Sequence, residues 1–260
     1  MTRTRILGLT ALAAAPLLAF AALQATEAQD APGAAMDEAE VARIVRETLM
    51  ANPEIIIQAV DRYYEAEALA EAAATEEVAA SLVPALARGE SGHALGASVA
   101  EADVVVVEFF DYHCGYCKRG VDFVMDLAEE DGVRVVLQDL PILREESREA
   151  ALLALAASES GGYAALHRVL MRTSGVLDRA ALEGAARRAD LRDLPEVLDD
   201  EAARARLTAR LDASVEAARA LRIDGTPAFL IARPDGSGVR LVPGYDPEAV
   251  RSAVASVREG

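Results

Sequence analysis

The sequence is poor in cysteine and in positive charge. Among 260 residues there are two cysteines and three histidines, and 26 lysines and arginines stand against 43 aspartates and glutamates, a formal net charge of −17. A chain of this length can bury a core without covalent staples, so a disulfide-rich scaffold is not indicated. The negative charge disfavours nucleic acids and anionic membranes as partners. A zinc site also lacks ligands, because the chain has no second CxxC and no HxxxH pair.

Long hydrophobic runs are missing except at the N-terminus. Two arginines precede an apolar run over residues 6–23, and small residues follow it. This order is typical of a secretory signal peptide, which we place at residues 1–28. The alternative is an uncleaved membrane anchor, which Pro16 and the small residues after the run disfavour. We therefore expect an exported protein without further membrane spans.

Residues 36–83 are predicted to form an N-terminal helical segment. Asp37 and Glu40 make a capping-box start, and NPE at residues 52–54 predicts a second start with Asn as its N-cap. Small and apolar residues then recur at spacings of three and four: Ile56, Ala59, Tyr63, Ala66, Ala70 and Ala73. Such a narrow stripe favours a self-associating stalk, and the alternative is that it packs on the chain's own globular domain. Residues 84–101 contain proline and several glycines and are predicted to be a linker.

Residues 102–260 are predicted to form an α/β domain. The run VVVVEFF at residues 104–110 is typical of a strand buried on both faces. A helix after the cysteines and a second strand from Val133 complete a βαβ unit with parallel strands. Residues 145–221 have the pattern of a helical insertion. The stretches TPAFLI, RPDGSG and VRLVPG then predict a hairpin, followed by a last helix capped by Asp246.

The two cysteines, Cys114 and Cys117, lie where the first strand of this unit meets the helix. At this spacing their side chains point the same way, and the helix N-terminus favours a thiolate at Cys114. Cys114 is therefore the predicted nucleophile, and Cys117 is predicted to resolve the mixed disulfide. A purely structural disulfide would close too small a loop to gain much stability. Copper(I) binding by the two thiols stays open as a secondary property.

A second candidate region is DGTPAF, in which Thr226 and Pro227 precede a strand. A cis proline there would expose the backbone of Thr226 to an extended peptide. From the residues alone an ordinary turn proline is the more common state, because few prolines are cis.

Taken together, VEFFDYHCGYCK leading into a helix and GTPAF before a closing ββα unit resemble the thioredoxin superfamily, specifically exported DsbA-like proteins. The stretches LMANPEIIIQAV, ALGASVAEAD and LPIL are similar to the suppressor-of-copper-sensitivity protein C (ScsC) branch. The resemblance implies a thioredoxin-like fold with a helical insertion, preceded by a helical stalk, in a periplasmic protein. It also implies that Pro227 is cis beside a Cys114–Cys117 disulfide, that Thr226 contacts the substrate backbone, and that Glu108 relays protons to Cys117. A simple salt bridge is the alternative role for Glu108.

Gly115 and Tyr116, between the cysteines, resemble the pair of exported disulfide isomerases and differ from the Pro-His of strongly oxidising DsbA proteins. Thr226 before the proline is also isomerase-like. With His113, these residues are expected to contact the substrate. We therefore expect a protein disulfide oxidoreductase, an isomerase or reductase without a cofactor, and the alternatives are a DsbA-type dithiol oxidase or a copper-tolerance protein. The implied partners are unfolded or misdisulfided exported proteins, a membrane redox partner and, through the N-terminal helices, a homotrimer.

Overall fold

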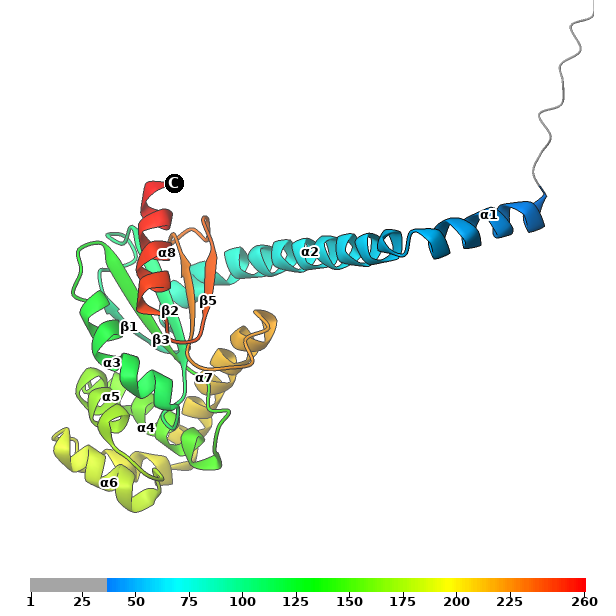
Figure 1. Ribbon diagram of the computed structural model, residues 1–260. Helices are drawn as coiled ribbons and strands as arrows, with labels where there is room; N and C mark the ends of the chain where they lie inside the picture. Colours follow the sequence, from blue (N-terminus) through cyan, green and yellow to red (C-terminus); the bar gives the residue numbers. More distant parts are fainter. Residues whose placement is uncertain (1–36) are drawn as a thin grey trace, which may run out of the picture. The chain divides into compact units, whose positions relative to one another are not determined.

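The structure is a computed structural model that describes residues 37–260 (Figure 1). The predicted signal peptide, residues 1–28, lies outside the described residues. The described residues divide into two units, of which the first ends at Ala59 and the second begins at Val60, and each is described by itself. Within residues 37–260, none of the helices has both the length and the apolar character that a membrane span requires.

The first unit contains α1 (Glu38–Ala51) and the beginning of α2 (Glu54–Ala87). Asp37 caps α1 as predicted. The prediction that Asn52 caps the next helix is wrong, because Asn52 ends α1 and its side chain donates a hydrogen bond to the carbonyl of Thr48 at 2.9 Å. The backbone N–H of Asn52 donates to the same carbonyl at 3.0 Å, so both donors of Asn52 close the last turn of α1.

Large apolar side chains are exposed along α1 and the first half of α2. Ile56 and Tyr63 of the predicted stripe are among them. The full set is Val41, Ile44, Val45, Met50, Ile55, Ile56, Ile57, Val60, Tyr63, Tyr64 and Leu69. Large apolar side chains exposed on helices are typical of an association surface. Self-association therefore stays a prediction that this surface supports.

The end of α2 differs from the linker predicted over residues 84–101. The helix continues through Pro84 to Ala87, and a four-residue strand, β1 (His93–Gly96), follows. Pro84 cannot donate a hydrogen bond to the carbonyl of Ala80. The helix nevertheless continues, because its last turns are buried against the sheet. The glycines near β1 and the brevity of this strand hide it from pattern analysis.

The second unit is built on a five-stranded sheet in the order β1-β3-β2-β4-β5. Strands β2 (Val104–Phe110) and β3 (Val133–Asp139) are parallel, as the predicted βαβ unit requires, and every residue of β2 is buried. The hairpin of β4 (Ala228–Ala232) and β5 (Arg240–Pro243) pairs antiparallel with β2 through β4. The predicted thioredoxin-like fold is confirmed.

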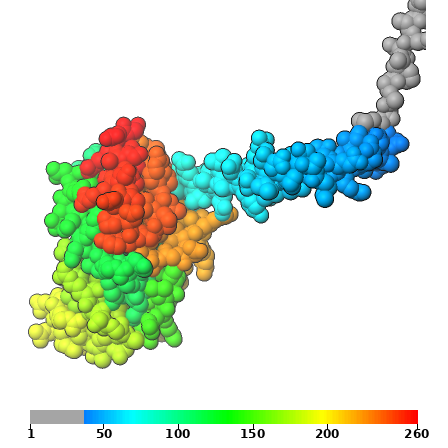
Figure 2. Space-filling model, viewed as in Figure 1, coloured from blue at the N-terminus to red at the C-terminus, as the bar shows by residue number. Residues whose placement is uncertain are grey.

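Helices cover both faces of this sheet (Figure 1). One face packs against α3 (Gly115–Leu127), α8 (Pro247–Glu259) and most of the helical insertion. The other face packs against the ends of α2 and α7. The insertion contains α4 (Glu145–Glu159), α5 (Tyr163–Arg172), α6 (Arg179–Arg188), a 3₁₀ helix (Leu194–Asp199) and α7 (Glu201–Ala220). The space-filling view shows the green surface of the α3 region adjoining the yellow-green surface of the insertion (Figure 2).

Candidate active site

Cys114 and Cys117 lie at the start of α3, directly after β2. Cys114 is the N-cap of α3, and its Sγ accepts a hydrogen bond from the backbone N–H of Cys117 at 3.3 Å. Both residues are free thiols in this structure, and both are buried, with exposed fractions of 4% and 1%. The structure therefore describes the dithiol form of the pair, and the redox-active disulfide stays a prediction.

The surroundings of Cys114 favour its thiolate. The hydrogen bond with the Cys117 side chain is the largest cause that lowers the pKa of Cys114 from 9.0 to about 5, and Thr226 and the backbone N–H groups of Cys117 and Tyr116 act in the same direction. No acidic residue lies in the first turn of α3 to oppose this effect of the helix N-terminus. For Cys117, burial raises the pKa far above its ordinary value. At neutral pH the pair is thus one thiolate and one thiol.

The loop before β4 contacts this pair. The peptide bond between Thr226 and Pro227 is cis, and the thiol of Cys114 donates a hydrogen bond to the carbonyl of Thr226 at 3.2 Å. The hydroxyl oxygen of Thr226 is buried and has no hydrogen-bond partner within the described part of the chain. Two segments separated by 112 residues in sequence therefore meet at the attacking sulfur.

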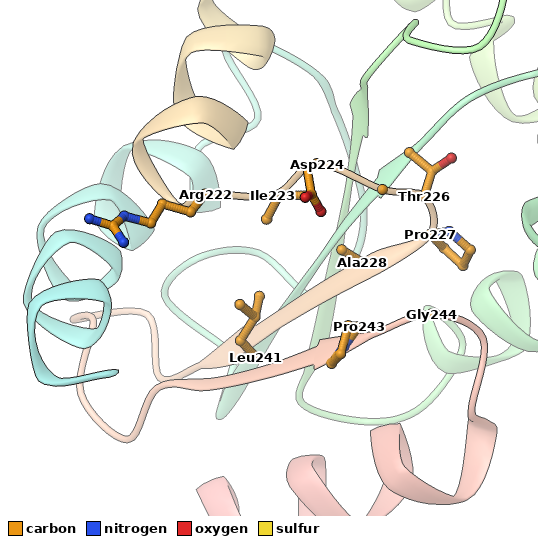
Figure 3. A pocket seen from close by; sticks show the side chains of 10 residues that line it. Arg222, Ile223, Asp224, Thr226, Pro227, Ala228, Leu241, Pro243 and Gly244 are labelled. Atoms are coloured by element: carbon orange, nitrogen blue, oxygen red, sulfur yellow. The ribbon is translucent and has the colours of Figure 1, made fainter. Parts of the chain in front are cut away.

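A cavity of about 220 Å³ borders Thr226 and Pro227 (Figure 3). Its apolar lining includes Leu241 and Pro243 of β5, and Asp224 adds a carboxylate. The Thr226 hydroxyl points away from Leu241 and Pro243 in the close-up view. The cavity offers an apolar surface next to the backbone that contacts Cys114, which is a suitable place for a side chain of an extended peptide.

Glu108 lies on β2, opposite Leu137 of β3 and Phe229 of β4, and its exposed fraction is 2%. Burial is the main cause that raises its pKa from 4.5 to about 8, and the charge of Cys114 adds to the shift. No cation contributes to this shift, which argues against the salt-bridge role. A buried acid that titrates near neutral pH can take up or release a proton during thiol chemistry.

The residues around the cysteines are not all free to meet a substrate. Tyr116 is exposed, with the guanidinium of Arg119 placed 4.1 Å from its ring centroid, and Gly115 is exposed beside it. Both ring nitrogens of His113 are engaged within the chain, and its contact with a substrate stays a prediction. Nδ1 is 2.8 Å from the hydroxyl of Ser147, and Nε2 accepts the N–H of Leu177 at 3.1 Å.

Asp111 is a site residue that the sequence analysis did not single out. Its carboxylate is buried and accepts hydrogen bonds from the backbone N–H of His113 at 2.7 Å and of Leu143 at 2.9 Å. It also accepts the hydroxyl of Ser147 at 2.7 Å. Asp111 thus fixes the turn that presents Cys114. An Asp that bonds the backbone two residues later is a recognisable turn signal in DYHC, although its contacts with the start of α4 are not.

Within residues 37–260 there is no group of three or more His, Cys, Asp or Glu side chains that could hold a metal ion. The two thiols by themselves are soft ligands suited to copper(I). Copper binding by Cys114 and Cys117 stays a prediction.

Comparison with protein families gives two matches. The DSBA-like thioredoxin domain matches residues 105–255, and the copper resistance protein ScsC N-terminal domain matches residues 37–68. The first match contains both cysteines, Glu108 and the loop at Thr226. The second match falls on α1 and the first half of α2, where the apolar side chains are exposed.

Solved structures with similar folds include two of ScsC from Proteus mirabilis. Its catalytic domain is 27% identical with a TM-score of 0.61, and the match covers 71% of this chain and 99% of that one. Proteus mirabilis ScsC in a compact conformation is 29% identical with a TM-score of 0.58, covering 84% of this chain and 96% of that one. A thioredoxin-like oxidoreductase from Silicibacter pomeroyi DSS-3 is 34% identical with a TM-score of 0.58, covering 67% of this chain and 96% of that one.

Among curated proteins, Na(+)/H(+) antiporter NhaA 1 of Salinispora arenicola is 33% identical over 163 residues, which is 62% of this chain and 24% of that protein. NhaA 3 of Salinispora tropica is 34% identical over 60% of this chain and 23% of that protein. The chain therefore spans about a quarter of the length of these curated relatives. The match of the thioredoxin domain to more than half of the chain assigns the family: this protein belongs to the DsbA-like thioredoxin-domain proteins and carries an ScsC-type N-terminal domain.

Proposed function

We propose that this protein is an exported thiol-disulfide isomerase or reductase that acts on the disulfides of client proteins through Cys114 and Cys117. The family supports thiol-disulfide oxidoreductase activity. The observation that carries the proposal is the asymmetry of the pair: Cys114 has a low pKa and contacts the carbonyl of Thr226, whereas Cys117 stays a buried thiol.

The chemistry proceeds by exchange at sulfur. The Cys114 thiolate attacks one sulfur of a client disulfide, which forms a mixed disulfide and releases the other client sulfur as a thiolate. In isomerisation, a client thiolate then attacks the client sulfur of the mixed disulfide, which forms a new client disulfide and restores the Cys114 thiolate. Formation of the mixed disulfide removes the negative charge of Cys114, which is one of the causes that raise the pKa of Glu108, so more of Glu108 is ionised at that stage. In reduction, the ionised Glu108 accepts the proton of Cys117, and Cys117 attacks the sulfur of Cys114, which releases the second client sulfur and leaves a Cys114–Cys117 disulfide.

Isomerase or reductase activity is favoured over oxidase activity by the residues around the pair. Gly115 and Tyr116 between the cysteines and Thr226 before the proline resemble those of exported isomerases. An isomerase must be kept as the dithiol, so the proposal includes a membrane redox partner that reduces the Cys114–Cys117 disulfide. Several active sites held in one assembly would increase the effective concentration of sites around a misfolded client.

Refolding of a client with scrambled disulfides tests this function. We expect the reduced protein to restore native disulfides, and Cys114→Ala to lose that activity because it lacks the attacking sulfur. The same client, supplied fully reduced to the oxidised protein, measures oxidase activity. Efficient oxidation combined with no gain in refolding of the scrambled client would identify a DsbA-type oxidase instead.

Self-association through α1 and α2 is the second part of the proposal. Ile56→Glu and Tyr63→Glu place charges on the exposed apolar surface, and each is expected to shift the mature protein from a trimer to a monomer. Gln58→Glu, at an exposed polar position of the same helix, is the matched control and should stay assembled. Sedimentation equilibrium gives the masses. A wild-type protein that is monomeric at all concentrations would contradict the assembled-isomerase proposal.

A further inference from the structure

A second cavity, of about 440 Å³, lies between the ends of α5 and α6 and has an unusual charge. It is lined by Arg168, Val169, Arg172, Thr173, Ser174 and Arg188. Three arginines thus converge on one cavity in a protein whose formal net charge is −17. Arginine recognises carboxylates and other oxyanions through paired hydrogen bonds, so the lining has the chemistry of an anion site. We name this surface the arginine pocket.

The arginines of this pocket are only partly neutralised by the chain itself. Arg172 pairs with Asp122 of α3 at 2.6 Å. Arg188 donates a hydrogen bond to the neutral hydroxyl of Thr173 at 3.0 Å. Within residues 37–260, Arg168 makes no ion pair with a carboxylate. Like charges that share a cavity repel each other, and an anion placed among them would remove that repulsion.

The ordinary explanation for arginines at such places is the helix dipole, because cations stabilise helix C-termini. Arg172 and Arg188 do lie in the last turns of α5 and α6. Arg168, however, lies one turn earlier in α5, and Arg188 directs its guanidinium to a hydroxyl. The dipole therefore accounts for the presence of two of the arginines but not for the convergence of all three.

The pocket is attached to the active site by two hydrogen bonds. Lys118, which directly follows Cys117, donates a hydrogen bond to the carbonyl of Thr173. Leu177 donates its N–H to Nε2 of His113, the residue before Cys114, at 3.1 Å. The segment from Thr173 to Leu177 is thus held by both flanks of the cysteine motif, and Asp122 of α3 reaches the same pocket through Arg172. The segment that lines one side of the arginine pocket is therefore fixed directly to the residues that flank Cys114 and Cys117.

We propose that the arginine pocket binds a carboxylate of the client, so that the protein reacts preferentially with disulfides that have Asp or Glu near the cysteine. The inference rests on the proposed function and specifies its substrate class. A carboxylate is the anion that polypeptide side chains carry, and the planar guanidinium groups match its geometry. The negative charge of the whole protein would by itself repel such clients, so any preference for them must come from a local site.

The test uses two disulfide-containing peptides that differ only by two glutamates or two glutamines beside the cysteine. The reduced full-length protein should react with the glutamate peptide about fivefold faster in kcat/KM, as expected for partly exposed charge-assisted contacts. Arg168→Gln and Arg188→Gln should each reduce this ratio toward one. Arg187→Gln removes the same charge from the neighbouring position, which does not line the arginine pocket, and should keep the ratio.

Because Arg188→Gln also removes the bond to Thr173, Arg168→Gln is the decisive variant. A ratio of one in the wild-type protein, with normal Cys114-dependent exchange, would overturn the inference and leave the proposed function intact. Failure to react with either peptide would overturn both. If Arg187→Gln lowered the preference for the glutamate peptide as much as Arg168→Gln does, the preference would come from the overall charge of this surface, and the inference would be overturned. Free glutarate should abolish the preference by competition; arginine-dependent glutarate binding without any peptide preference would assign the pocket to a free anion and overturn the client site.

Discussion

Replacing Glu108 with glutamine is expected to stabilise the reduced protein at pH 7 by roughly 3 kcal/mol and, at the same time, to slow its redox chemistry. The buried carboxyl has a pKa of about 8 in the folded protein. An unfolded chain returns it to about 4.3. Glutamine has nearly the same shape but no proton to lose, so it removes the free energy needed to keep this group protonated.

The sign of the pH dependence follows from proton binding. Between about pH 4.3 and pH 8, the folded protein holds the Glu108 proton and the unfolded chain releases it. The contribution of Glu108 to the free energy of unfolding is therefore largest below that range and is lost as the pH rises through it. The variant should match the wild-type protein near pH 4 and exceed it increasingly up to pH 8.

The kinetic effect runs in the opposite direction. Cys117 must lose a proton before it attacks the mixed disulfide, and burial has raised its pKa far above neutral. Without the Glu108 carboxylate the proton must reach water directly, so the resolving step should slow on the order of a hundredfold. Chemical trapping of the mixed disulfide over time measures that step, and a lifetime equal to that of the wild-type protein would remove Glu108 from the proton path.

Urea unfolding of the reduced protein at pH 4, 6 and 8 measures the stability. Glu129→Gln, an exposed position with the same change of charge, is the control and should follow the wild-type protein at each pH. Equal stabilities of Glu108→Gln and wild type at pH 8 would mean that Glu108 is not held protonated in the core.

The fold could be predicted where local sequence and tertiary structure agree. Strand β2 is a continuous β-branched and aromatic run, and its burial on both faces matches that composition. The end of α2 could not be predicted, because Pro84 and the following glycines suggest a break and the opposing stability comes from the sheet against which the helix packs. The half-buried edge strand β1 owes its conformation to β3, which lies about forty residues later in the sequence.

The active site divides in the same way. The cysteine spacing and the Thr-Pro pair are local patterns, so Cys114, Cys117 and Thr226 could be selected from the sequence. The engagement of both His113 nitrogens could not, because their partners come from α4 and from the segment before α6. The arginine pocket could not be predicted either, because it forms only when the chain folds. Arg168 and Arg188 lie on different helices, and in the sequence each resembles an ordinary exposed arginine.

Thr226→Val is expected to make the Cys114–Cys117 disulfide a weaker oxidant, lowering its reduction potential at pH 7 by about 30 to 60 mV. Thr226 is one of the groups that lower the pKa of Cys114. Its buried hydroxyl has no partner within the described residues of the dithiol form, so it is free to donate a hydrogen bond to the Cys114 thiolate. A hydrogen bond to a charged group contributes about 1.5 to 3 kcal/mol, or about one to two pKa units. Valine keeps the branched shape but removes the donor.

The direction of this change follows from which redox form contains the thiolate. Only the reduced protein has it, so loss of the hydrogen bond destabilises the reduced form and favours the disulfide. The wild-type potential should fall by about 59 mV per pH unit below the Cys114 pKa, where reduction takes up two protons, and by about 30 mV per unit above it, where one is taken up. In the wild-type protein this change of slope is expected at about pH 5.

Equilibration with glutathione between pH 4 and pH 8 measures both the potential and the change of slope. In Thr226→Val the break should move upward by about one to two pH units, and Thr226→Ser, which keeps the hydroxyl, should retain the wild-type curve. If the valine variant had a lower reduction potential but the slope still changed at the wild-type pH, the substitution would have altered the stability of the disulfide form and not that of the Cys114 thiolate. Equal curves for all three proteins would mean that the Cys117 side chain and the N-terminus of α3 hold the pKa of Cys114 low without Thr226.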